Sequence, residues 1–235
     1  MGSNKGIVQT MESTYWLARG ILKPSLGLWF RWHIEGLERI PKSGPAILAV
    51  NHIAYLDPFA AAYVVDSAGR RPRFLAKSEL FQDKRIAWIL RGANQIEVKR
   101  GTEAAPMALD HAFAALEKGE VVVIFPEGTI TTHPDLSPME ARTGIARLAL
   151  GSGVEVLPMA VWGTANVWGK GYAKRWWPRQ ELCVRVGEPM RPGGSIDDPT
   201  TWKAAGAEIM GEIGRLVASL RPVIPDRRRP KKEAA

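Results

Sequence analysis

Short apolar runs alternate along this chain with longer stretches of helical periodicity. The apolar runs, which predict buried strands, cover residues 45–50, 72–76, 95–98, 120–125, 154–161 and 181–187. The helix-like stretches cover residues 57–66, 84–91, 103–118, 140–151 and 200–220. A chain with this alternation buries its apolar faces by packing helices on a sheet. The sequence therefore predicts a single α/β domain with a largely mixed β-sheet flanked by helices.

A histidine follows the first of these apolar runs, and an aspartate lies five residues further on. His52 stands where the predicted strand at 45–50 enters a loop, the usual position of a catalytic group on a rigid scaffold. Asp57 precedes Pro58, which is the chemistry of a helix cap with proline at the first helical position. If this helix folds back over the loop, the Asp57 carboxylate reaches one ring nitrogen of His52 and leaves the other as a base. A histidine near a capping aspartate is more often structural, so this spacing alone does not establish catalysis.

A second apolar run ends in another polar loop. The predicted strand at 120–125 leads into the sequence Pro-Glu-Gly-Thr at 126–129. An α/β sheet gathers the ends of such strands at one edge, where ligands bind. We therefore expect Glu127 to lie at the same edge as His52, although their separation along the chain shows no contact by itself.

The charge balance favours an anionic partner. The chain has 32 Lys and Arg against 24 Asp and Glu, a formal net charge of +8, which suits nucleic acid, anionic lipid or a phosphorylated substrate. We find no zinc-finger spacing and no recognisable nucleic-acid-binding motif, so we expect no nucleic-acid partner. The single cysteine, Cys183, excludes an internal disulfide and a cysteine-based metal cage. Without a His-x-x-x-His pattern we expect no metal site.

The chain divides into four parts by composition. Residues 1–10 lack the apolar core of a signal peptide and are expected to be an added extension or a disordered end. Residues 11–33 are Trp-rich and basic, with too many interruptions for a transmembrane helix, and this pattern is typical of a helical segment in the membrane interface. A helix packed on the domain is the alternative. Residues 34–222 form the predicted α/β domain. Residues 223–235 are expected to be a disordered basic tail, attracted to anionic headgroups by roughly 1 kcal/mol per charge.

The two polar loops together resemble the first and third motifs of the glycerolipid acyltransferase family, typified by 1-acylglycerol-3-phosphate acyltransferases. The motifs are Asn51-His52 to Asp57 and Phe125 to Thr129, and the likeness extends from about Glu35 to Pro189. It also covers the segments 77–80, 98–101 and 156–159. The resemblance implies transfer of a fatty acyl group from acyl-CoA or acyl carrier protein to a hydroxyl of lysophosphatidic acid, giving phosphatidic acid. No cofactor beyond the acyl donor is implied.

The resemblance also implies roles for individual residues. His52 is expected to act directly on the acceptor hydroxyl as a general base, oriented by Asp57. No Gly-x-Ser-x-Gly elbow occurs, so a covalent serine intermediate is not indicated. Glu127 is expected at the acceptor, with a carboxylate bonded to loop N–H groups as the alternative reading. Further substrate-binding residues are expected at Asn51, Gly128 and Thr129, and N–H groups near Gly128 or His52 are candidates for an oxyanion hole.

One position departs from the family pattern. The relatives usually carry an arginine after the threonine of the third motif, where it is taken to bind phosphate, but this chain has Ile130. Lys77 and Arg100 are the best substitutes, and Arg142 and Arg147 are weaker ones, since each is also readily explained as a solvent-exposed charge. The departure keeps other acceptors open, such as another lysophospholipid or glycerol 3-phosphate.

The expected partners are a lysophospholipid acceptor, acyl-CoA and an anionic membrane surface. The expected location is the cytoplasmic side of a membrane, as a peripheral, monotopic protein. A non-catalytic protein that binds anionic membranes is the second class of function, but binding alone needs no base and no orienting carboxylate. A nucleic-acid binder is the third, supported by net charge alone.

Overall fold

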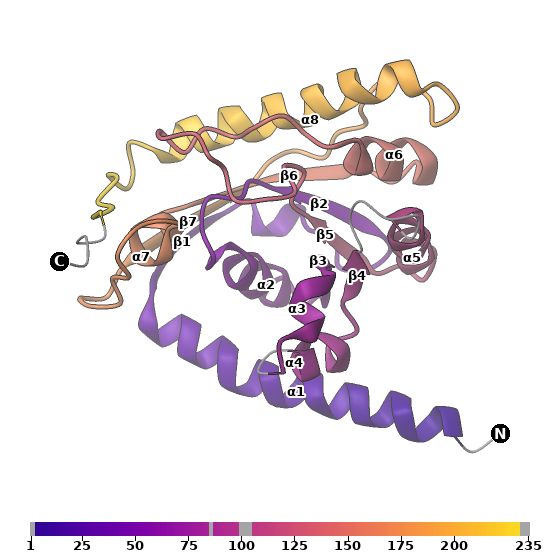
Figure 1. Cartoon of the computed structure of the whole chain (residues 1–235), viewed down its shortest axis with the longest axis horizontal. Coiled ribbons are helices and arrows are strands. Elements are labelled where there is room, and N and C mark those ends of the chain that lie inside the picture. Colours follow the sequence, from indigo (N-terminus) through magenta and orange to yellow (C-terminus); the bar gives the residue numbers. More distant parts are fainter. Residues whose placement is uncertain (1–2, 85–86, 99–104, 231–235) are drawn as a thin grey trace.

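A mixed seven-stranded sheet forms the middle layer of the protein (Figure 1). The computed structural model describes residues 3–84, 87–98 and 105–230. Its strands are β1 (Arg31–Glu35), β2 (Ala46–Val50), β3 (Pro72–Lys77), β4 (Ile96–Val98), β5 (Val121–Ile124), β6 (Val156–Trp162) and β7 (Glu181–Val186). Their order across the sheet is β1-β7-β6-β2-β5-β3-β4. Among these strands the β6–β7 pair is antiparallel and the other pairs are parallel, so the predicted mixed sheet in one α/β domain is confirmed.

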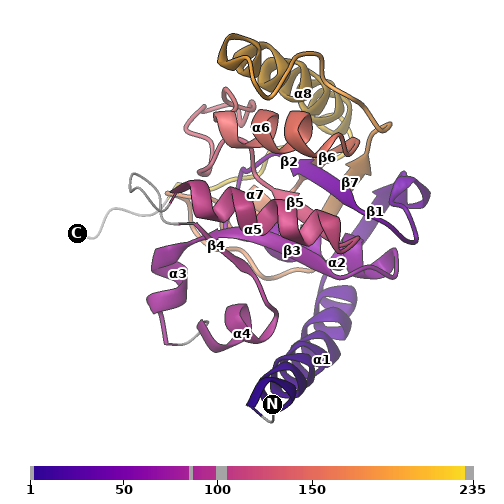
Figure 2. The same ribbon diagram turned by 90° about the vertical axis from the view of Figure 1, so that its right-hand side faces the viewer.

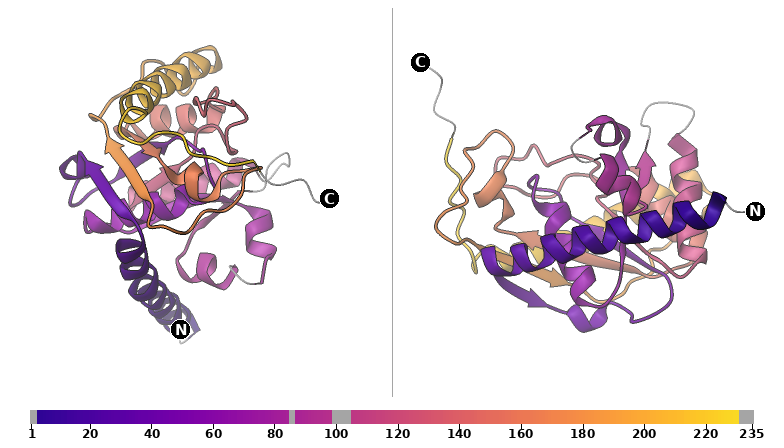
Figure 3. Two further views of the ribbon diagram at one scale, coloured as in Figure 1. Left: turned by 90° about the vertical axis from the view of Figure 1, so that its left-hand side faces the viewer. Right: turned by 90° about the horizontal axis from the view of Figure 1, so that it is seen from below.

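Helices cover both faces of this sheet. They are α1 (Ser3–Trp29), α2 (Asp57–Ser67), α3 (Ser78–Gln82), α4 (Ala87–Gly92), α5 (Ala105–Glu117), α6 (Thr143–Ser152), α7 (Thr164–Trp168) and α8 (Pro199–Leu220), with a short 3₁₀ helix at Leu37–Arg39. The helices α5, α6 and α8 pack on one face, and α2 packs on the other (Figures 1 and 2). The long α1 crosses beneath α2, α3 and α4 (Figure 3).

The central strand β2 shows why the core has two halves. All of its residues are buried, as expected for a strand covered on both faces. Because successive side chains of a strand point to opposite faces, Ile47 and Ala49 join the core under α5, α6 and α8. Leu48 and Val50 join the core under α2. The register of the strand is therefore fixed by packing on both of its faces.

Two basic side chains of α1, Arg19 and Lys23, face inward, toward one aspartate of α2. Arg19 Nε lies 2.5 Å from Asp66 Oδ1, Lys23 forms an ion pair with the other carboxylate oxygen, and the Tyr15 hydroxyl donates at 3.4 Å. Burial alone raises the pKa of Asp66, but hydrogen bonds from Arg19 and Lys23 outweigh it and hold this pKa below its ordinary value. Over residues 15–17 and 19–29, the part of α1 whose side chains the structure describes, the outward side carries exposed Trp16, Leu17, Ile21, Leu28 and Trp29.

Several elements differ from the sequence prediction. The helix expected at 11–33 runs from Ser3 to Trp29, and residues 31–33 belong to β1 instead. The sequence of residues 11–33 did not indicate β1, because this strand forms by parallel pairing with β7, which lies far away in the sequence. The short helices α3 and α7 were not predicted either, since helices of a single turn have too little periodicity to show.

Part of the tail expected to be disordered is docked on the domain. The Arg227 N–H donates to Asn166 Oδ1 at 2.6 Å, and the Arg229 carbonyl accepts from Ala173 N at 2.9 Å. Pro230 forms an isolated β-bridge with Tyr172. The predicted disorder is therefore wrong for residues 223–230, because hydrogen bonds to the segment 166–173 hold this part of the tail on the domain. Residues 231–235 lie outside the described residues.

The Asp66 contacts predict how firmly α1 is held. Asp66→Ala leaves Arg19 and Lys23 without their partner, and we expect α1 to detach more easily by about 1–2 kcal/mol. Limited trypsin digestion within α1 should then become roughly 5- to 30-fold faster. Asp110→Ala, which removes an exposed carboxylate of α5 that makes no such contact, is the matched control. Equal cleavage rates for the wild type and Asp66→Ala would contradict this account of α1.

Candidate active site

The predicted His52–Asp57 pair forms at the carboxyl end of β2. His52 Nδ1 lies 2.9 Å from Asp57 Oδ2, and this oxygen also accepts the N–H groups of Ile53 at 2.6 Å and Ala54 at 2.7 Å. Asp57 is the first residue of α2 rather than its cap, because its carboxylate turns back onto the preceding loop. A carboxylate on Nδ1 fixes the ring with its proton there and leaves Nε2 available as a base.

A threonine completes the surroundings of the Asp57 carboxylate. Thr164 Oγ1, at the start of α7, donates to Asp57 Oδ1 at 2.5 Å. Asp57 is completely buried, and an ionised carboxylate in such a place needs hydrogen-bond donors on both oxygens. Thr164 was missed by the sequence prediction, since no pattern in the sequence connects it to a residue 107 positions away.

Asn51 positions the loop from the other side. Its side-chain amide donates to the Val161 carbonyl of β6 at 3.0 Å and accepts the Val161 N–H at 2.7 Å. The side chain is fully buried, and Asn51 is not among the residues that line the neighbouring pocket. Its observed contacts are therefore those of a residue that ties the His52 loop to β6, rather than of the expected substrate-binding group.

Glu127 joins the two motif loops. Its Oε1 accepts the His52 backbone N–H at 2.8 Å, and its Oε2 accepts the Met139 N–H at 3.0 Å. Burial raises the pKa of Glu127, although the N–H groups of Met139 and His52 act in the opposite direction. The geometry matches the alternative reading of Glu127, a carboxylate held by loop N–H groups that fixes the position of the histidine.

The rest of the third motif is a tight turn. Gly128 has φ of 71°, a left-handed conformation that favours glycine, and its N–H donates to the Phe125 carbonyl at 2.9 Å. Gly128 lines the pocket beside His52, whereas Thr129 is half-buried and does not. Because the Gly128 N–H is used inside the turn, the structure gives it no role as an oxyanion donor.

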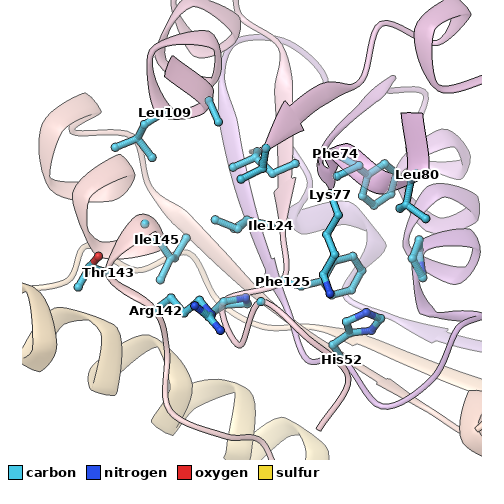
Figure 4. Close-up of a pocket in the computed structure, with 18 of the residues that line it drawn as sticks. His52, Phe74, Lys77, Leu80, Leu109, Ile124, Phe125, Arg142, Thr143 and Ile145 are labelled. Atoms are coloured by element: carbon cyan, nitrogen blue, oxygen red, sulfur yellow. The ribbon is translucent and has the colours of Figure 1, made fainter. Parts of the chain in front are cut away.

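A pocket of about 520 Å³ opens in front of His52 (Figure 4). The Phe125 ring stacks on the imidazole, with 4.4 Å between ring centroids. Most of the wall is apolar, and its aliphatic and aromatic members include Phe74, Leu75, Leu80, Leu90, Leu109, Ile124 and Ile145. Among the described residues, the cations Lys77, Arg142 and Arg147 also line it. A base beside an apolar wall with a few cations suits an amphipathic, anionic substrate.

The cations differ in how free they are to bind a ligand. Lys77 ends β3 and extends toward Phe125 and His52 (Figure 4), and within the described residues it forms no ion pair. Arg142 lies on another side of the pocket, with its Nε 3.4 Å from the Glu127 carbonyl. Arg147 lies over the Trp202 ring at 5.1 Å. Arg100, the other expected phosphate-binding residue, lies outside the described residues.

Ile130 is buried and does not line the pocket, so the position of the missing arginine faces the protein interior.

In the ranges that the structure describes, no group of three or more His, Cys, Asp or Glu residues is arranged to hold a metal ion.

Comparison with known proteins identifies the family. A family model described as Acyltransferase matches residues 31–162, more than half of the chain. The chain belongs to the acyltransferase family, and the resemblance seen in the sequence is confirmed.

Individual relatives agree with this assignment. The chain is 30% identical to a chloroplastic 1-acyl-sn-glycerol-3-phosphate acyltransferase (LPAT1) of Arabidopsis thaliana over 145 residues, which cover 61% of this chain and 39% of the relative. It is 27% identical to a lyso-ornithine lipid O-acyltransferase of Pseudomonas aeruginosa over 148 residues, 63% of this chain and 52% of that protein. The matched region thus spans about half or less of these two relatives.

A solved structure shares the fold over most of the chain. It is the crystal structure of the 1-acyl-sn-glycerophosphate acyltransferase PlsC from Thermotoga maritima, with a TM-score of 0.65 and 26% sequence identity. The match covers 92% of this chain and 80% of that one.

The Thr164 contact gives a direct test of the site. Thr164→Val removes the donor to Asp57 Oδ1 and leaves a buried charged oxygen unsatisfied, so we expect a loss of about 1.5–3 kcal/mol in stability and a lower turnover. Thr164→Ser keeps the hydroxyl and should restore most of both. Thermal unfolding and a transferase assay measure the two effects. A valine variant as active and as stable as the wild type would show that the carboxylate does not depend on this donor.

Proposed function

We propose that this protein transfers a fatty acyl group from acyl-CoA, or acyl carrier protein, to a hydroxyl of lysophosphatidic acid and so makes phosphatidic acid. The observation that carries the proposal is the His52 ring, held by Asp57 on Nδ1 and lining a pocket that is both apolar and cationic. The names of the relatives support the same acceptor, since both the Arabidopsis protein and the Thermotoga structure are 1-acylglycerophosphate acyltransferases by name.

The proposed reaction needs one proton carrier and no covalent enzyme intermediate. His52 Nε2 takes the proton of the acceptor hydroxyl as its oxygen attacks the thioester carbonyl carbon. The C–O bond forms, the C–S bond breaks, and the departing thiolate receives the proton from the imidazolium. Asp57 keeps the ring oriented and stabilises the transient positive charge. The bound acyl donor and acceptor supply all atoms of the product, so no cofactor takes part.

Substrate binding follows from the lining of the pocket. The apolar wall accommodates acyl-chain methylenes, each worth about 0.8 kcal/mol when buried. Lys77 is the cation best placed for the acceptor phosphate, because it extends toward His52 and has no ion-pair partner among the described residues. Arg142 is the second. Both act in place of the arginine that Ile130 replaces.

A different acceptor is the second candidate function. Ile130 is buried where the relatives usually carry the phosphate-binding arginine. The Pseudomonas relative is named for a lyso-ornithine lipid, an acceptor of another class. Another lysophospholipid or glycerol 3-phosphate could accept the acyl group by the same reaction. Mass spectrometry of the products formed from palmitoyl-CoA and each of these acceptors in turn distinguishes them.

We also propose that the protein works at an anionic membrane surface, on its cytoplasmic side, as a peripheral protein. The support is the outward side of α1, where apolar side chains are exposed while Arg19 and Lys23 turn inward to Asp66. Over the described ranges, no helix combines the length and apolar character needed to cross a bilayer.

His52→Ala tests the chemistry. We expect formation of phosphatidic acid from palmitoyl-CoA and lysophosphatidic acid, followed by mass spectrometry, to fall by about 10²- to 10⁴-fold because the general base is lost. His111→Ala, at an exposed position of α5, should keep full activity. Undiminished turnover by a folded His52→Ala protein would remove His52 from the role of base.

Lys77→Gln tests the phosphate site. Loss of a charge-assisted contact should raise the KM for lysophosphatidic acid about 10- to 100-fold and leave the KM for acyl-CoA unchanged. For monoacylglycerol, which has no phosphate, the variant should match the wild type. Lys203→Gln on α8, a lysine with an 83% exposed side chain, is the charge-matched control. If the KM for lysophosphatidic acid does not move, the phosphate lies elsewhere, and Arg142→Gln becomes the variant to measure.

A further inference from the structure

A loop rich in tryptophan and basic residues lies between α7 and β7. Trp177 is 80% exposed and Trp176 37% exposed, unusual values for the largest apolar side chain. The loop is fixed to the carboxyl end of α1, because Trp29 Nε1 donates to the Trp176 carbonyl at 3.1 Å. Arg179 adds hydrogen bonds to the Phe30 and Gly27 carbonyls at 2.7 and 3.1 Å. The loop therefore lies beside the carboxyl end of α1 (Figure 3), and its exposed tryptophans add apolar surface next to the exposed Trp29.

Arginines surround a cavity of about 500 Å³ next to Trp177. Arg31, Arg175 and Arg227 line it, together with Arg179, which is already bonded to the end of α1. Among the described residues of the lining, Glu181 is the one carboxylate. Within the part of the chain that the structure describes, Arg31, Arg175 and Arg227 form no ion pair, so the cavity carries an excess of unneutralised positive charge.

This surface is rigidly connected to the candidate active site. Gly169 forms a β-bridge with Ala54, and the Tyr55 N–H donates to the Trp168 carbonyl at 3.2 Å. The Trp168 and Trp176 rings lie 6.0 Å apart. The loop that holds His52 and the tryptophan loop are thus neighbours joined through backbone contacts.

We infer that Arg31, Arg175, Arg227 and Trp177 form a binding site for the headgroups of anionic phospholipids in a bilayer. Arginine guanidinium groups match phosphate geometry, and tryptophan prefers the interface between headgroups and hydrocarbon. The site extends the membrane contact of α1 to the side next to the His52 loop, and thereby sets the orientation of the pocket toward the lipid. The inference rests on the membrane association proposed above. It adds a second contact with the membrane, besides α1, and specifies that the lipids bound there are anionic.

The test is the partitioning of the full chain into vesicles of phosphatidylcholine, with and without phosphatidylglycerol. Arg31→Gln/Arg227→Gln removes two unpaired charges, and we expect roughly 25-fold weaker partitioning into the anionic vesicles, from about fivefold for each charge. Binding of the variant to neutral vesicles should equal that of the wild type, and high salt should reduce the difference between them. Arg191→Gln/Arg215→Gln, on exposed residues away from the cavity, is the charge-matched control and should bind like the wild type.

A second variant keeps the test independent of the charges. Trp177→Ser should weaken binding to both kinds of vesicle and should remove part of the blue shift in tryptophan fluorescence that binding produces. Full activity of these variants toward a dispersed short-chain acceptor would show that the fold and the pocket are intact.

The outcomes separate the inference from the function. Equal partitioning of the wild type and Arg31→Gln/Arg227→Gln, or no preference of the wild type for anionic vesicles, would overturn the headgroup site and leave the α1 contact standing. A wild type that binds neither kind of vesicle would overturn the headgroup site together with the membrane association. Turnover measured with dispersed substrate would still report on the chemistry of His52.

Discussion

The buried carboxylate of Asp57 is the interaction on which the site depends. Removing an ionised carboxylate from water costs several kcal/mol, and four donors offset that cost here: the His52 ring, the N–H groups of Ile53 and Ala54, and the Thr164 hydroxyl. These donors come from the loop after β2 and from α7, so satisfying one charge assembles both elements. The orientation of the imidazole is a consequence of the same arrangement, because its Nδ1 is one of the four.

A second buried carboxylate fixes the histidine from its backbone. Glu127 accepts the His52 N–H and thereby links the loop after β2 to the loop after β5. Burial raises the pKa of Glu127 above its ordinary value of 4.5. Ionising Glu127 therefore lowers the free energy of unfolding, and this loss develops as the pH rises from the ordinary pKa through the raised pKa of the folded state. Some stability is thus lost in order to fix His52, whose ring is held by Asp57 and whose backbone is held by Glu127. Such a loss is common where a group must be positioned for chemistry.

The apolar runs of the sequence predicted the central strands and the site residues that follow them. The runs that became β2 and β5 are continuously apolar, and the parallel sheet brings their carboxyl ends to one edge, so His52, Asp57 and Glu127 were placed together correctly. Contacts between distant segments were missed, since nothing near Thr164 indicates that it donates to Asp57. The same applies to β1, which exists because β7 pairs with it, and to Asn51, whose amide partner lies on β6.

The proposed mechanism requires that Asp57 hold His52 with its proton on Nδ1 and its Nε2 lone pair available to the acceptor hydroxyl. The most direct measurement is nitrogen NMR of the protein with labelled histidine at neutral pH, in which His52→Ala assigns one of the four histidine signals. We expect the nitrogen signals of a His52 ring that carries a proton on Nδ1 and none on Nε2. A ring protonated on Nε2 alone would contradict it, because the nitrogen assigned as the base would then carry a proton.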